Sequence, residues 1–134
     1  MNSELGFVVP IKLPYDQAVE AVTAALKNEG FGVLTRIDVK ATLKEKLGQD
    51  FRPYVILGAC NPPLAHRALS ADPEVGLMLP CNVTVEEQPD GSSLARIANP
   101  VIMMTAGNLG KNPALVEVAE AAFAKLDRVA NSLR

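Results

Sequence analysis

The sequence predicts one α+β domain in which a mixed or antiparallel sheet carries helices mainly on one face. Segments of alternating apolar residues indicate strands, and amphipathic segments of helical period lie between them. Asp90-Gly91, between two alternating segments, is typical of a β-hairpin turn. A hairpin combined with strand–helix units favours an α+β arrangement. The 134 residues suit a single domain, residues 1–134.

Nine elements are expected from the pattern of apolar residues and breakers. Pro10 within the first strand indicates an edge strand, because proline cannot donate to a ladder. The elements are, in order, a strand at residues 7–13, a helix from Pro14 to Gly30, a strand at 31–37, a short helix from Asp38 to Gly48, a strand at 54–60, a helix from Asn61 to Asp72, a strand at 81–86, a strand at 93–97 and a helix from Asn112 to Leu133.

Two of these helices begin with the same pair of residues. Asn61-Pro62 and Asn112-Pro113 each place an N-cap residue before a proline in the first helical position. The uncharged segment 99–110 contains two glycines and fits neither a strand nor a helix clearly. The pattern therefore leaves that segment unassigned.

The most apolar strand runs from Tyr54 to Cys60. Its apolar residues are continuous and do not alternate with polar ones, which is typical of a strand covered on both faces. We therefore expect it in the interior of the sheet.

Composition excludes several classes of protein. Hydrophobic residues make up 49% of the chain, enough for a core without disulfides, and the net charge of -2 argues against nucleic-acid binding. No apolar run reaches the length of a membrane span, and residues 1–4 do not resemble a secretory signal. Two cysteines without a leader favour free thiols and a cytoplasmic location. A mature chain whose leader had been removed would show the same pattern.

Two cysteine-bearing segments carry a resemblance to an uncharacterised bacterial family, domain of unknown function 302. The turn at Gly91 and Asn99-Pro100 fit the family more loosely, since Asp is expected before that proline. The carrying residues are Tyr54-Val55-Ile56-Leu57-Gly58-Ala59-Cys60-Asn61-Pro62, Ala65, Ala68 and Gly76-Leu77-Met78-Leu79-Pro80-Cys81-Asn82-Val83-Thr84-Val85. The resemblance covers essentially the whole chain. It implies an α+β fold like that of the TATA-binding protein and a homodimer, and it implies no activity.

Cys60 and Cys81 are the candidate reactive residues. Cys60 ends a strand just before a helix start, where a thiolate would be stabilised, although a small buried side chain is the commoner role. Cys81 shares a strand face with Val83 and Val85, which favours the core. If the two strand ends adjoin, the pair suits a redox dithiol, a sulfur acceptor or a soft-metal site. Their spacing of about 21 residues lacks the Cys-x-x-Cys pattern of common redox and zinc motifs.

His66 is the only histidine and completes a candidate metal set with Cys60 and Cys81. Thiolate, imidazole and nearby methionine sulfur suit copper(I) or haem iron. A lone histidine on a short helix is more often exposed, and the sequence identifies no cofactor. A Cys60–His66 nucleophile pair is disfavoured, because the helix would carry His66 more than a turn away.

Three other features have simpler interpretations. Residues 107–112 vaguely resemble a phosphate loop but lack the Walker spacing, so a loop before a helix is favoured. Lysines 40, 44 and 46 form a solvated helix face. Glu86 and Glu87 would face opposite sides of a strand and form no acid–base pair.

Three hypotheses for function follow. The first is a non-enzymatic binding module that holds a small ligand, or a soft metal or haem, in an apolar cleft walled by the sheet and by segment 99–110. Its expected ligand-binding residues are Cys60, Asn61, Cys81 and Met103. The second is a thiol enzyme or sulfur carrier that uses Cys60. The third is a structural dimer module in which both cysteines are packed.

Overall fold

The sheet has five strands, all paired antiparallel, in the order β1-β5-β4-β3-β2. The computed structural model describes residues 2–134. The strands are β1 (Gly6–Ile11), β2 (Gly32–Asp38), β3 (Tyr54–Cys60), β4 (Cys81–Glu87) and β5 (Ser93–Ala98). The first strand is at the edge of the sheet, as Pro10 predicted, and β2 forms the other edge.

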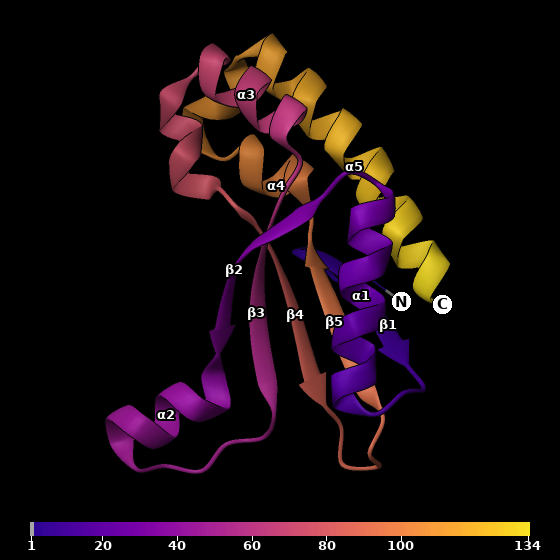
Figure 1. Cartoon of the computed structure of the whole chain (residues 1–134). Helices are drawn as coiled ribbons and strands as arrows, with labels where there is room; N and C mark the ends of the chain where they lie inside the picture. The colour runs from indigo at the N-terminus through magenta and orange to yellow at the C-terminus, as the bar shows by residue number, and fades with distance from the viewer. Residues whose placement is uncertain (1) are drawn as a thin grey trace.

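The longest helices, α1 and α5, lie together along one side of the sheet (Figure 1). Helix α3 packs against α5 beyond one end of the strands, and α2 projects from the other end. The helices are α1 (Tyr15–Asn28), α2 (Val39–Leu47), α3 (Pro62–Ala71), α4 (Pro100–Met104) and α5 (Pro113–Leu133), with short 3-10 helices η1 (Pro73–Met78) and η2 (Gly107–Lys111). The α+β class with helices mainly on one face is thus confirmed.

Strand register builds the core in rows beneath these helices. Leu57 on β3 is opposite Val83 on β4, and Val83 is opposite Ile97 on β5, which is opposite Phe7 on β1. All four side chains are buried. Because side chains alternate along a strand, every second residue joins such a row, and the residues between them face away from α1 and α5.

The prediction that Tyr54–Cys60 is covered on both faces is wrong for the single chain. Tyr54 and Ile56 are only half-buried, whereas Val55 and Leu57 on the other face are buried. The cause is the placement of the helices, since α1 and α5 both pack on the same face. We refer to the opposite face, which carries Ile56, as the open face.

Segment 99–110, which the sequence pattern left unassigned, contains α4 and begins η2, and residues 73–78 form η1. Asn99 caps α4 by accepting a hydrogen bond from the amide of Val101, at 2.9 Å. Asn61 and Asn112 cap α3 and α5 in the same way, as predicted. One device, an asparagine before proline, therefore begins three helices at the end of the sheet where α3 lies.

Gly58 lies where neighbouring side chains leave no room for a Cβ atom. A Cβ built there would lie 2.1 Å from Oγ1 of Thr35 and 2.8 Å from Cγ of Pro80. Thr35 is the cross-strand partner of Gly58, and Pro80 directly precedes β4. Glycine at this position therefore allows the side chains of Pro80 and Thr35 to pack directly against the backbone of β3.

We predict that Gly58→Ala lowers the free energy of unfolding by about 1–3 kcal/mol, the usual cost of overpacking a close-packed site. Gly32→Ala is the matched control, because a Cβ at Gly32 meets nothing within 4 Å. Gly32→Ala should leave stability unchanged or slightly higher, since alanine reduces the freedom of the unfolded chain. Urea unfolding of both variants measures the difference, and equal midpoints for the two would contradict the packing argument.

Candidate functional site

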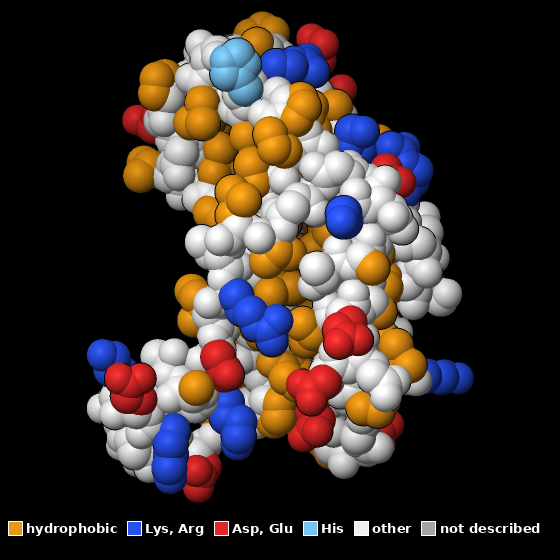
Figure 2. All heavy atoms as spheres, viewed as in Figure 1, with side chains coloured by type: hydrophobic (Ala, Val, Ile, Leu, Met, Phe, Trp, Pro, Cys, Tyr) orange, Lys and Arg blue, Asp and Glu red, His pale blue; other side chains and the backbone are white. Residues whose placement is uncertain are grey.

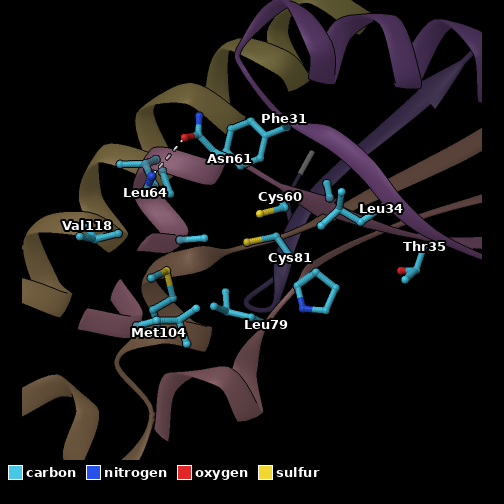
Figure 3. A pocket seen from close by; sticks show the side chains of 15 residues that line it. Phe31, Leu34, Thr35, Cys60, Asn61, Leu64, Leu79, Cys81, Met104 and Val118 are labelled. Carbon is cyan, nitrogen blue, oxygen red and sulfur yellow. Dashed lines mark hydrogen bonds between the residues drawn. The ribbon is translucent and has the colours of Figure 1, made fainter. Parts of the chain in front are cut away.

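An apolar cavity of about 330 Å³ lies at the end of the sheet nearest α3 (Figure 3). Both cysteines are on its wall, and they come from the adjacent strands β3 and β4. Its lining residues are Phe31, Leu34, Thr35, Ala59, Cys60, Asn61, Leu64, Ala65, Leu69, Leu79, Pro80, Cys81, Met104, Val118 and Ala122. None of these side chains is charged at neutral pH.

The end of the β3–β4 ladder makes room for the cavity. Cys81, the first residue of β4, is opposite Ala59, and β3 continues for one more residue to Cys60. Pro80 lies over Gly58 and leaves the space beside Cys60 free of a strand neighbour from β4. The cavity therefore borders the buried residues Ala59 and Cys81 as well as Cys60 at the end of β3.

A β-bulge in β2 brings Leu34 to the cavity mouth. Val33 is opposite Ala59 and Thr35 is opposite Gly58, so Leu34 is the extra residue between two neighbouring partners. Bulges redirect side chains in this way beside functional sites. Leu34 is 69% exposed and Leu69 is 43% exposed, so both present apolar surface to solvent at the mouth. Hydrophobic side chains gather on this part of the surface (Figure 2).

Asn61 holds the start of α3 against the end of α1 at the wall of the cavity. Its Oδ1 accepts a hydrogen bond from the amide of Leu64 at 3.2 Å, and its Nδ2 donates to the carbonyl of Glu29 at 3.4 Å. The first bond caps α3 and the second ties that cap to the end of α1. Asn61 is buried, and satisfying both ends of its amide stabilises the junction.

The two thiols have different surroundings within the one cavity. Cys60 is half-buried and Cys81 is buried. Burial, together with the neighbouring Cys60, raises the pKa of the Cys81 thiol to about 11. Only the thiolate is nucleophilic, so Cys81 is a poor nucleophile at neutral pH. Cys60 is the more accessible of the two sulfurs.

The structure brings together three of the four expected ligand-binding residues. Cys60, Asn61 and Cys81 line the cavity, but Met103 does not. Met103 lines a neighbouring cavity of about 200 Å³, and Met104 takes the place expected for it. The two methionines lie on different sides of the short helix α4, whose start and orientation the sequence did not reveal.

The expected metal set is not brought together. His66 is exposed on α3 and does not line the cavity with Cys60 and Cys81. Across residues 2–134, no three or more His, Cys, Asp or Glu side chains form a group that could hold a metal ion. On α3 the buried residues are Leu64 and Ala68, whereas His66 is on the exposed side of the helix.

Part of the cavity wall was missed by sequence analysis. Segment 99–110 contributes Met104, whereas α5 contributes Val118 and Ala122. Both α5 residues lie on the buried face of that helix. Their spacing of four residues indicated a buried face, but no local signal could show that this face borders a cavity as well as the core.

A cluster of charged side chains lies on the open face, away from the cavity. Glu86 is 4% exposed and accepts hydrogen bonds from Nε of Arg52 at 2.6 Å and from Nη1 of Arg96. Burial acts to raise the pKa of this carboxyl, but the hydrogen bonds and charges of the two guanidinium groups outweigh it and lower the pKa. Glu86 is therefore an ionised bridge between two arginines, and that role suits structure better than proton transfer.

We predict that the single thiol of a Cys60→Ser variant, Cys81, is alkylated by iodoacetamide at a rate that rises about tenfold per pH unit between about pH 8 and pH 10. Burial is the larger of the two causes that raise the pKa of Cys81 to about 11 in the wild type, and it remains in the variant. The thiolate fraction increases tenfold per pH unit below the pKa. The same variant in denaturant is the control and should level off at lower pH. A rate for the folded variant that levels off below pH 10 would contradict the predicted effect of burial.

Comparisons with known proteins place the chain in a family. A family model, Domain of unknown function DUF302, matches residues 7–133. A solved structure, the crystal structure of uncharacterized conserved protein DUF302 from Bacillus stearothermophilus, is 32% identical with a TM-score of 0.85, covering 98% of this chain and 100% of that one. No curated protein matches the chain. Within residues 2–134, no helix has the length and apolar character to cross a bilayer. The match over residues 7–133 and the similarity of the solved structure show that this chain belongs to the DUF302 family.

Proposed function

We propose that the chain is a non-enzymatic binding module that holds a small, uncharged, mainly apolar ligand against Cys60 and Cys81. The observation that carries this proposal is the cavity of about 330 Å³ whose wall has apolar side chains, two thiols and very few polar groups. Ligand sites are typically concave, mostly apolar and supplied with a few fixed polar groups. Asn61 and Thr35 are such groups here.

The chemistry of the wall limits the ligand. A carboxylate or phosphate would lose its hydration on entry and would find no cation among the lining residues. Phe31 is the only aromatic side chain on the wall, so most of the contact surface is aliphatic. The volume lies near the lower limit of ligand pockets, about 300 Å³. These features favour a compact neutral molecule with one hydrogen-bonding group.

A soft metal ion is the second candidate ligand. Its support is that three sulfur atoms, from Cys60, Cys81 and Met104, line one cavity. Thiolate and thioether sulfur select copper(I) among biological metals. Haem has less support, because its carboxylates would find no cation on the wall and His66 lies outside the cavity.

The remaining alternative is a thiol-based enzyme or sulfur carrier using Cys60. The position of Cys60, half-buried at the end of β3 and directly before the cap of α3, supports this alternative. No general base lines the cavity among the residues described, so the binding role has the broader support.

We predict that the protein binds the neutral apolar fluorophore N-phenyl-1-naphthylamine and that Ala65→Phe weakens this binding about tenfold or more. Ala65 lines the cavity, and a phenyl ring there fills space that the probe needs. Ala41→Phe is the matched control, because Ala41 is exposed on α2 and does not line the cavity. Fluorescence titration measures both affinities.

Several results separate the candidates. If Ala65→Phe loses probe binding while Ala41→Phe keeps it, and both variants have the melting temperature of the wild type, the cavity is supported as the ligand site. Equal binding by wild type and both variants would mean that the probe binds elsewhere and would contradict the proposal. Copper(I) titrated into the probe complex distinguishes the metal candidate, which requires the metal to displace the probe and to lose affinity in Cys60→Ser.

We also propose that two copies of the chain associate through the open face, and we expect light scattering to give twice the chain mass of 14.3 kDa. The support is that β3 is apolar on both faces, while half-buried Ile56 and its neighbour Ile37, 49% exposed, remain uncovered. Ile37→Asp should shift the mass toward a single chain, because a buried unpaired charge opposes association. A wild-type mass of one chain would overturn this proposal.

A further inference from the structure

The two cysteines meet from neighbouring strands inside one cavity. Cys81 is opposite Ala59, so Cys60 is offset from it by a single residue along β3. Strand spacing and rise per residue place Cα atoms in this relation about 6 Å apart. Disulfides typically join Cα atoms separated by about 4.4–6.8 Å. Neighbouring residues of a strand point to opposite faces, but at the end of β3 both cysteines line the same cavity. The two thiols lie close together, because Cys60 contributes to the raised pKa of Cys81 (Figure 3).

The pair is also asymmetric in access. Cys60 is half-buried at the end of β3, close to the mouth formed by the exposed side chains of Leu34 and Leu69. Cys81 lies deeper, 8% exposed, on the face of β4 that points toward the core. A small reagent that enters from solvent therefore meets Cys60 first.

We propose that Cys60 and Cys81 form a reversible thiol–disulfide couple, in which Cys60 attacks a low-molecular-weight disulfide and Cys81 resolves the adduct. This inference goes beyond the proposed binding function and does not depend on it. It assigns a redox chemistry to two residues whose separation in sequence matches no common redox motif.

The reaction balances in two exchange steps. The Cys60 thiolate attacks one sulfur of oxidised glutathione, forms a mixed disulfide and releases one glutathione thiolate, which takes up a proton. The Cys81 thiolate then attacks the sulfur of Cys60 and releases the second glutathione. In total, the two protein thiols lose two electrons and two protons, and one oxidised glutathione becomes two reduced glutathiones.

The apolar surroundings accommodate the disulfide as well as they accommodate neutral thiols, and they disfavour charged thiolates. A disulfide is neutral, and the lining residues contribute no cation that would stabilise a thiolate. Cys60 is the one titratable group on the wall that faces Cys81. The buried Cys81 is a slow attacking group at neutral pH, so the second step should be rate-limiting and should accelerate as the pH rises.

The test uses the whole reduced protein and oxidised glutathione, with no ligand added. Wild type should first gain the mass of one glutathione and then lose it, ending two hydrogens lighter than the reduced chain. Trypsin cleaves after Arg67, between the two cysteines, so a linked pair of peptides identifies the internal bond. The rate of the second step should rise about tenfold per unit between about pH 7 and pH 9.

Single variants test the assigned roles. Cys81→Ser should retain one glutathione on Cys60, and Cys60→Ser should gain none over the same time at pH 7. Cys81→Ala serves instead if the serine variant fails to fold, since alanine adds no polar group to the buried site. Wild type that keeps glutathione on Cys60 at every pH, or that does not react, would overturn the couple, and a fast adduct on Cys81 in Cys60→Ser would overturn the assigned order.

Because no ligand is present, a negative result here leaves the cavity proposal intact. Conversely, failure of N-phenyl-1-naphthylamine to bind would leave the thiol couple untouched. Peptide mapping of oxidised wild type in glutathione buffers of graded ratio then measures the fraction of linked cysteines and confirms that the bond reverses.

Discussion

Burial of one face of the sheet beneath α1 and α5 is the constraint on which the rest of the structure depends. Rows of apolar side chains such as Leu57, Val83 and Ile97 gain stability only if the strands keep their register. A slip of one residue would turn each row to the open face. The register in turn fixes where the β3–β4 ladder ends, which places Cys60 beside Cys81 and opens the cavity.

The cavity is a continuation of the core past the end of that ladder. Beyond Ala59 and Cys81 the strands no longer pair, and α3, α4 and α5 supply the wall. An apolar wall suits a neutral ligand, and burial in that wall, together with the neighbouring Cys60, raises the pKa of the Cys81 thiol. Ligand binding and thiol chemistry thus share one physical cause. The ionised Glu86 lies on the open face, where Arg52 and Arg96 offset its burial.

Local features predicted much of the fold. The caps at Asn61 and Asn112, the edge position of Pro10 and the core-facing Cys81 follow from bonds or patterns within a few residues. The site was harder to predict. Met103 was expected to line the cavity, but Met104 lines it instead. Consecutive residues of a helix point in directions about 100° apart, so the residue that faces the cavity depends on where the short helix α4 begins and how it is oriented. The bulge at Leu34 has no local signal, since it arises from pairing with β3.

The sequence by itself determined the family, the order along the chain of the five strands and the four longest helices, and the placement of both cysteines at strand ends. Those properties depend on composition, periodicity and short motifs. Tertiary structure alone decided that Cys60 and Cys81 share a cavity, that His66 does not join them and that one face of β3 remains open. Each of these outcomes depends on which surfaces meet when distant segments pack, and the packing free energy of a segment depends on its partner as much as on its own residues.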